Sequence, residues 1–228
     1  IGLVEGSSDL AGSRTAAAMH VAEVLGIRSE DVHPSVGDTD SIGYTAISAG
    51  SSAVYKTGWA SFEAARDLQR QLAARAALLW GVPVEDVDIN DGIFSPRTNP
   101  ESRLTLKELA ASQNTTGGPL VGRASGVWGG ESPGFAVHIV DVEVDPETGK
   151  TDIIRYTALQ DPGTSIHPLY VEGQIQGGAV QGIGWALNEE YVIDGEGRML
   201  NSSLLDYRMP TALALPMIAA QIVEVPNP

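Results

Sequence analysis

The stretch YVEGQIQGGAVQGIGWALNEE at residues 170–190 reads as one helix that contains five glycines. In a helix interior each glycine costs about 1 kcal/mol relative to alanine. The set therefore loses about 5 kcal/mol of local helix preference, and we infer that something approaches the helix backbone closely and offsets that loss. These glycines are Gly173, Gly177, Gly178, Gly182 and Gly184.

The periodicity of an α-helix gives this stretch two different faces. An amide side chain both donates and accepts hydrogen bonds, so a face of glutamines and glycines suits a flat heterocycle or an anionic tail lying against the helix. Tight packing against another helix or a sheet, with solvated glutamines, explains the pattern about as well. The polar residues exclude a membrane helix. The polar face comprises Gln174, Gly177, Gly178 and Gln181, and the apolar face Ile175, Ala179, Ile183 and Ala186.

Composition limits the kind of ligand and partner. The 228 residues are 43% hydrophobic, enough for one large domain or two small ones. Acidic residues outnumber basic ones 29 to 14, and a net charge of −15 argues against nucleic acid or an anionic membrane as partner. An anionic ligand must therefore be held by backbone N–H groups. The chain has no cysteine, so it offers no disulfide and no iron–sulfur ligand.

Two other stretches of small residues precede predicted helices. DLAGSR at residues 9–14 is a turn that leads into a helix at 15–25. GDTDSIGYTAISAGSS at residues 37–52 is a loop too long for a simple connector, and an amphipathic helix follows at 56–80. Together with residues 173–181, these stretches would cradle a large, flat, anionic cofactor if they met in space. The sequence does not show that they meet.

The remaining patterns predict an α+β fold with long helices packed on mostly antiparallel β-hairpins. Strands are expected at 32–36, 87–89, 135–144, 151–159 and 217–225, with hairpin turns at 90–93, 145–150 and 194–197. Thr105 is the expected N-cap of a helix at 106–111, with Glu108 three residues on. The glycine-rich residues 117–134 are compatible with a boundary between two subdomains.

Other chemistry has weaker support. The run Gly149-Lys150-Thr151 lacks the upstream glycine of a phosphate-binding loop. The four histidines have no metal-binding spacing, and the adjacent Glu189 and Glu190 diverge on a helix, so we expect a solvated helix end. A hydrolase that uses Ser51 or Ser52 as nucleophile stays a weak alternative, because neither lies in a GxSxG elbow.

The three stretches, in this order, resemble the second cofactor-binding domain of the molybdopterin-binding large subunit in the xanthine dehydrogenase/aldehyde oxidase family of molybdenum hydroxylases. The resemblance spans essentially the whole chain, residues 1–228. Its most specific part is EGQIQGGAVQGIGWALNEE at 172–190, and the others are YTAISAGSS at 44–52 and SSDLAGSRT at 7–15. Residues 134–150 and 160–168 resemble the hairpin and the turn that precede the glutamine helix in this family.

The resemblance implies a molybdenum–pyranopterin cofactor and a set of residues that contact it. Gln174 matches a glutamine that hydrogen-bonds the pyranopterin, and Gly50 holds the position nearest the metal. Leu10 and Ala11 replace the first two residues of a glycine–glutamine–glycine turn, so only backbone contacts are expected from Ala11 and Gly12. No side chain is expected to bind the metal directly. The expected cofactor-binding residues are Ala11, Gly12, Ala49, Gly50, Ser51, Ser52, Gln174, Gly177 and Gly178.

The resemblance also implies a reaction, the hydroxylation of an aldehyde or N-heterocycle with oxygen from water. Electrons would leave through iron–sulfur clusters and FAD on other domains or subunits. The family's catalytic glutamate lies in a GVGE-type motif downstream of the strand that ends at Val225, and no such motif occurs here. We therefore expect a fragment that is inactive alone and lacks a catalytic residue of its own.

The expected partners are the remaining molybdopterin-binding domain, the iron–sulfur and FAD domains or subunits and a small-molecule substrate. Neither nucleic acid nor a membrane is expected as partner, and we expect an oligomer in the cytoplasm. The alternative is a ligand-binding module without oxidoreductase activity.

Overall fold

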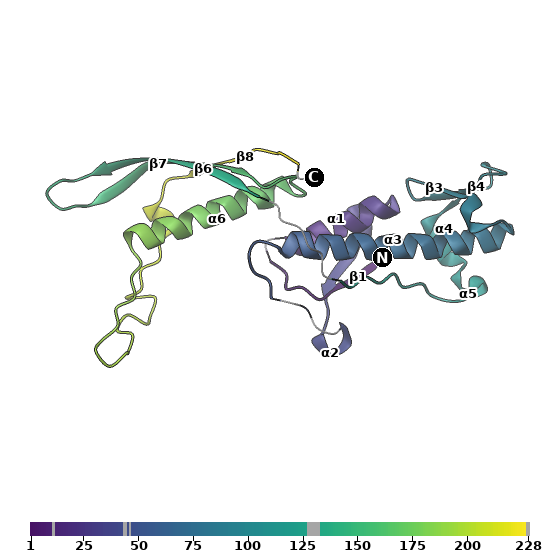
Figure 1. Cartoon of the computed structure of the whole chain (residues 1–228), viewed down its shortest axis with the longest axis horizontal. Helices are drawn as coiled ribbons and strands as arrows, with labels where there is room; N and C mark the ends of the chain where they lie inside the picture. Colours follow the sequence, from purple (N-terminus) through teal and green to yellow (C-terminus); the bar gives the residue numbers. More distant parts are fainter. Residues whose placement is uncertain (11, 43–44, 46, 127–132, 227–228) are drawn as a thin grey trace. The chain divides into compact units, whose positions relative to one another are not determined.

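The computed structural model describes residues 1–10, 12–42, 45, 47–126 and 133–226. The chain divides into two compact units, Ile1–Gly129 and Gly130–Pro228 (Figure 1). Each unit combines helical and β-sheet structure, and the expected α+β class is confirmed. In the described ranges, no helix combines the length and the apolar composition that crossing a membrane requires.

The first unit has two small sheets and two long helices. Strands β1 (Gly2–Glu5) and β2 (His33–Val36) pair in parallel, with Gly2 opposite His33 and Glu5 opposite Val36. The other sheet is antiparallel, in the order β3-β4-β5. Its strands are β3 (Val87–Asn90), β4 (Ile93–Pro96) and β5 (Leu104–Thr105), and the helices are α1 (Ser13–Leu25), α2 (Thr39–Ile42), α3 (Ala53–Trp80), α4 (Leu106–Ala111) and α5 (Gln113–Thr116).

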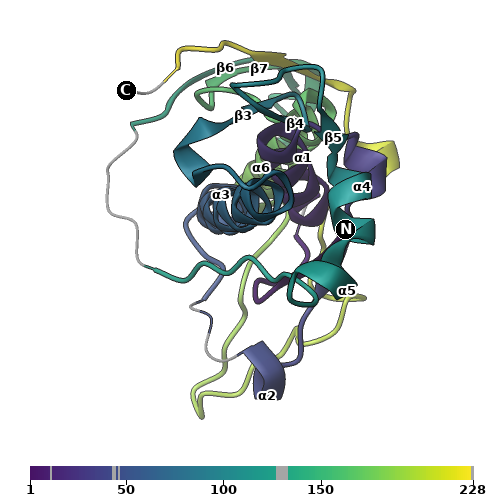
Figure 2. The same cartoon turned by 90° about the vertical axis from the view of Figure 1, so that its right-hand side faces the viewer.

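Helices α1 and α3 lie side by side and run in the same direction (Figures 1 and 2). Early in α3 and just past the middle of α1, a Cβ added at Gly58 would lie 2.8 Å from the ring of His20. Further along both, the side-chain amide of Gln69 donates to the carbonyl of Val24 at 2.7 Å. The two helix N-termini therefore lie at the same end of the unit.

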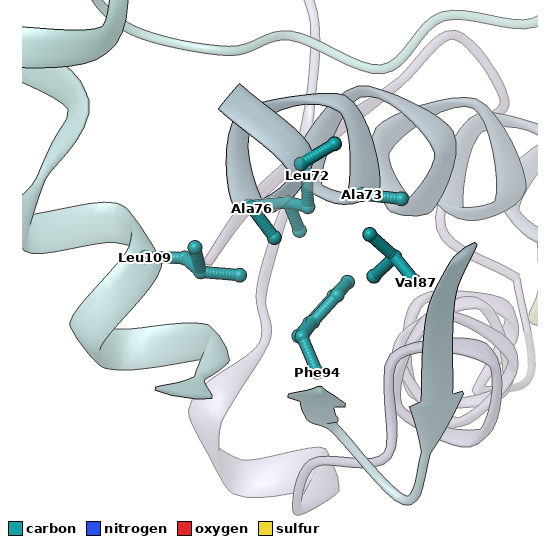
Figure 3. Packing of buried hydrophobic residues seen from close by; sticks show 7 residues of the cluster. Leu72, Ala73, Ala76, Val87, Phe94 and Leu109 are labelled. Atoms are coloured by element: carbon teal, nitrogen blue, oxygen red, sulfur yellow. The ribbon is translucent and has the colours of Figure 1, made fainter. Parts of the chain in front are cut away.

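One buried cluster of this unit lies where the small residues of α3 meet the β3–β4 hairpin, and another lies between α1 and α3. Phe94 and Leu109 are each 1% exposed, and Ala76 is completely buried between them and the rest of α3 (Figure 3). Alanines on this side of α3 let the hairpin approach the helix closely. The period of residues 56–80 predicted such a helix, and α3 begins three residues earlier at Ala53.

Helix α4 begins with the predicted cap. The backbone N–H of Glu108 donates to the hydroxyl of Thr105 at 3.3 Å, and the backbone N–H of Thr105 donates to the Glu108 carboxylate at 2.7 Å. This reciprocal capping box satisfies two N–H groups that the helix itself leaves unpaired.

The second unit is a three-stranded sheet with one long helix against it. Strand β6 (Phe135–Val144) pairs antiparallel with β7 (Thr151–Asp161), and β8 (Ile218–Ile222) lies parallel to β7. Helix α6 (Pro168–Leu187) packs on the sheet (Figure 1). The strand expected at 217–225 is shorter than predicted, and its parallel pairing adds to the antiparallel hairpins that were expected. The contact is made by Ile175, Ala179 and Ile183 of α6 with Tyr156, Ala158 and Ile218 of the sheet.

Candidate functional site

Helix α6 carries an open stripe of glycines and glutamines. Gln174, Gly177, Gly178 and Gln181 are all exposed. A Cβ added at Gly177 or Gly178 would meet no atom of the described structure within 4 Å. The backbone of α6 is therefore bare on this side, with two amide side chains along it. This surface fits a flat group with mixed donors and acceptors, because such a group can lie directly on the backbone and bond to the amides.

The last turn of α6 departs from the predicted pattern. Ala186, expected on the apolar face, is exposed, and Gly184 takes the buried position instead. A Cβ added at Gly184 would collide with the carboxylate of Glu189 and come within 2.8 Å of Pro210. What approaches this glycine is therefore the chain's own loop after the helix.

Glu189 anchors that loop. Its carboxylate accepts a 2.6 Å hydrogen bond from the hydroxyl of Tyr207, and this bond raises the pKa of Tyr207 to about 12. The ring of Tyr191 stacks on that of Tyr207 with the ring centres 5.4 Å apart. The expectation of a solvated helix end is therefore wrong for Glu189, because its carboxylate ties residues beyond the helix back to α6. Glu190 is exposed as expected.

In the first unit, the two predicted loops end in left-handed backbone just before their helices. Gly12 has φ 81° at the start of α1, and Gly50 has φ 64° shortly before α3. Ser51 has φ 55°, which is unusual for a residue with a side chain and stores backbone strain at this place.

The N-cap residues of α1 and α3 do not cap these helices with their side chains. In this described part of the chain, neither N-cap residue, Gly12 or Ser52, makes a side-chain capping bond, and neither first turn contains an acidic residue. The Ser52 hydroxyl donates instead to the carbonyl of Ala49 at 2.7 Å. In α1 the N–H of Ser13 already donates to the carbonyl of Leu10 at 2.9 Å, so an anion would have to use the N–H groups that follow it and those at the start of α3.

The two loops adjoin each other. The hydroxyl oxygens of Ser7 and Ser48, one from each loop, lie 3.5 Å apart. With α1 and α3 parallel, the structure brings together the neighbourhoods of Gly12 and of Ala49, Gly50, Ser51 and Ser52. Gln174, Gly177 and Gly178 belong to the second unit. Ala11 lies outside the described residues, as do Tyr44 and Ala46 of the second motif.

A titratable residue that sequence reasoning missed is Glu5, at the end of β1. It is 6% exposed, and neither carboxylate oxygen has a hydrogen-bond partner in the described structure. Burial, followed by repulsion from Asp9, raises the pKa of Glu5 to about 7, and attraction to Arg14 opposes the rise. Alternation along the strand was the available signal, since Leu3 and Glu5 share the side that faces the core.

The hydrolase alternative gains no support from the geometry. His20 Nδ1 pairs with the carbonyl of Ala16 at 2.7 Å, and His138 Nδ1 pairs with the hydroxyl of Tyr156 at 2.8 Å. Over the residues that can be described, no hydrogen bond joins a histidine to Ser51 or Ser52. Among the described residues, neither serine therefore has the hydrogen-bonded base that nucleophilic catalysis needs.

Comparison with known proteins gives one consistent result. The family model described as a molybdopterin cofactor-binding domain matches residues 3–216. The nicotine 6-hydroxylase large subunit of Paenarthrobacter nicotinovorans is 32% identical over 95% of this chain and 28% of its own length. A putative xanthine dehydrogenase molybdenum-binding subunit of Escherichia coli strain K12 is 34% identical over 95% of this chain and 30% of its own length.

Solved structures agree with the sequence relatives. A Cu,Mo-CO dehydrogenase in its carbon monoxide reduced state superposes with a TM-score of 0.81 at 29% identity, over 99% of this chain and 29% of that one. Quinoline 2-oxidoreductase from Pseudomonas putida 86 gives a TM-score of 0.81 at 28% identity, over 100% of this chain and 30% of that one.

The chain thus spans less than a third of the length of these relatives. The family match covers the open glycine–glutamine stripe of α6 and both loops of the first unit. This chain belongs to the molybdopterin cofactor-binding domain family of the molybdenum hydroxylase large subunits.

Proposed function

We propose that this chain supplies part of the molybdenum–pyranopterin site of an oxidoreductase that hydroxylates an aldehyde or an N-heterocycle. The observation that carries the proposal is the bare backbone of α6 between Gln174 and Gln181. A helix under selection for stability alone would not keep glycines at positions where a side chain has free space, because each lowers helix stability by about 1 kcal/mol.

The chain's own residues would divide the work of binding. Gln174 would hydrogen-bond the edge of the heterocycle, while Gly177 and Gly178 let that group reach the helix backbone. The loops in the first unit would offer backbone N–H groups to the anionic part of the cofactor. When bound, the cofactor supplies the two-electron oxidation that transfers oxygen from water to carbon. The proposed set in these loops is Ala11, Gly12, Ala49, Gly50, Ser51 and Ser52.

Backbone binding fits the charge of the molecule. With a net charge of −15, the chain lacks a surplus of cationic side chains to hold an anion. Uncapped helix N-termini with adjacent left-handed loops provide positive potential from the backbone itself. The proposed site can therefore retain an anionic group inside an acidic protein.

The chain would act together with other domains or subunits of a larger enzyme. The relatives are named as a large subunit, a molybdenum-binding subunit and a large chain, which supports partner subunits. We place the whole chain in the second cofactor-binding domain. Other domains or subunits would supply the remaining molybdopterin-binding domain, the iron–sulfur clusters, FAD and the glutamate that acts as base. We also propose that the complete protein is an oligomer and lies in the cytoplasm.

The test is the complete protein, purified with its partners and assayed for dye-coupled oxidation of aldehydes and N-heterocycles. In this background, Gln174→Ala removes a hydrogen-bonding partner and should weaken cofactor binding by about 1–3 kcal/mol. Cofactor loss during dilution, followed by pterin fluorescence, measures the effect.

The matched control is Gln176→Ala on the same helix. Gln176 donates to the carbonyl of Ile218 at 3.1 Å, so its loss should lower the unfolding temperature while the cofactor stays bound. Equal cofactor loss in both variants would contradict the role given to Gln174. A wild-type protein that binds the cofactor but oxidises no substrate would instead favour a binding module.

A further inference from the structure

Glu5 has a carboxylic acid side chain at a buried position of β1, where an apolar residue is expected. In β1, Val4 is 60% exposed and faces away from the core, whereas Leu3 packs against the cluster formed by α1, α3 and Val32. Glu5 follows Leu3 on that inner side and is 6% exposed. An ionised carboxylate without a partner is costly in such a place, so the neutral form is the one that fits the fold.

Glu5 stands next to an ion pair that closes the following loop. Arg14, in the first turn of α1, pairs with Asp9, and its hydrogen bond lowers the pKa of Asp9. The same loop is tied to α1 by Ser13, whose hydroxyl accepts from the N–H of Leu10 at 3.1 Å and donates to the carbonyl of Ser8 at 3.4 Å. Residues 8–10 are thus tied to the start of α1 by a few polar contacts.

Arg14 lies within electrostatic reach of two carboxyl groups. It attracts Glu5, and Asp9 repels Glu5, so both residues of the ion pair act on the buried carboxyl. While Glu5 is neutral, Arg14 has one anionic partner, Asp9. When Glu5 releases its proton to water, the new buried charge competes for the same guanidinium.

We propose that Glu5 is a positioning residue whose protonation controls the loop at residues 7–10. The neutral carboxyl leaves Arg14 with Asp9 and keeps the loop closed on the start of α1. Ionisation of Glu5 turns Arg14 toward the buried charge, breaks the Arg14–Asp9 pair and loosens the loop. No bond other than the O–H bond of Glu5 changes in this step.

This inference connects to the proposed function through Gly12, because the loop presents Gly12 at the α1 N-terminus. A closed loop would keep those N–H groups in place for the cofactor. The protein should accordingly hold its cofactor more firmly at slightly acid pH than at slightly alkaline pH. Only this last link rests on the proposed function.

The test is hydrogen exchange of the peptide covering residues 7–12 in the complete protein with its partners. Rates are measured at about pH 6 and about pH 8.5, corrected for the intrinsic pH dependence of exchange, on either side of the titration. We expect wild-type protection to fall about tenfold or more at the higher pH. Glu5→Gln, which is neutral at both pH values, should keep equal protection.

Two further variants sharpen the test. Glu23→Gln makes the same change at an exposed position of α1 and should behave like the wild type. Asp9→Asn removes the partner that holds Arg14, so the loop should exchange rapidly at both pH values. A wild-type loop without pH dependence, or a Glu5→Gln loop that keeps the wild-type dependence, would overturn the proposal.

The molybdenum content of the same samples tests the loop's role in cofactor binding separately from the control of the loop by Glu5. If loop exchange follows Glu5 and molybdenum retention follows loop exchange, both stand. If exchange follows Glu5 while retention is the same at both pH values, the control by Glu5 stands and the loop's part in cofactor binding is wrong.

Discussion

At the scale of single residues, Glu5 gives the chain an unusual dependence of stability on pH. Its pKa is about 7 in the folded chain against an ordinary value of 4.5, so the folded state binds this proton more tightly than the unfolded state does. The stabilisation is complete below about pH 4.5 and is lost as the pH rises to about 7. The difference corresponds to about 3 kcal/mol at most.

Glu5→Gln should remove this dependence. Above about pH 7 the variant should be more stable than the wild type, because it buries no charge there, and its stability should change less between about pH 5 and pH 7. Denaturant unfolding across this range, with Glu23→Gln as control, measures both effects. A variant less stable than the wild type at alkaline pH would show that attraction between ionised Glu5 and Arg14 outweighs the cost of burying the Glu5 charge.

At the scale of elements, the glycines of α6 lie in two different environments. Gly182 lies where a Cβ meets no described atom within 4 Å, whereas Gly184 is covered by Glu189 and Pro210. Gly182→Ala should therefore stabilise the helix by up to about 1 kcal/mol. Gly184→Ala should lower stability, because the added methyl group displaces Glu189 from its bond with Tyr207.

Both variants replace a glycine of α6 by alanine, at positions only two residues apart. Their unfolding temperatures can therefore be compared directly. Opposite signs are expected. A stabilising Gly184→Ala would mean that the loop after α6 does not rest on the helix as described.

Local sequence patterns predicted most helices and strands, but they did not predict which distant strands pair with each other. The period of α3, the Thr105–Glu108 cap and the β6–β7 hairpin depend on neighbours in the sequence, and these predictions are confirmed. The parallel pairs β1–β2 and β7–β8 join strands separated by helices, and hydrophobic alternation carries no information on which distant strand is the partner. The same limit hid the role of Gly184, since Pro210 reaches it from a distant loop.

The candidate site could be predicted in part. The open side of α6 followed from helix periodicity, because Gln174 and Gln181 fall on one face of any regular helix. The contact between Ser7 and Ser48 depends on how α1 packs against α3, which no local pattern encodes. Glu5 was missed because a single glutamate in a short strand looks like an ordinary surface residue until its burial is known.

At the scale of the whole molecule, the candidate residues are shared between two units. The first unit contributes two uncapped helix N-termini, and the second contributes a bare helix face. The helix N-termini of the first unit suit an anionic group, and the helix face of the second suits a flat heterocycle. We propose that the bare face of α6 holds the cofactor.

The molybdenum and pterin content of the complete protein carrying Gly177→Leu tests this role of α6. The leucine has free space and a better helix propensity by about 1 kcal/mol, so the fold should be as stable as in the wild type while the cofactor is lost. Ala186→Leu, exposed on the same helix away from the stripe, should retain the cofactor. A stable Gly177→Leu protein with normal molybdenum and pterin content would contradict the account.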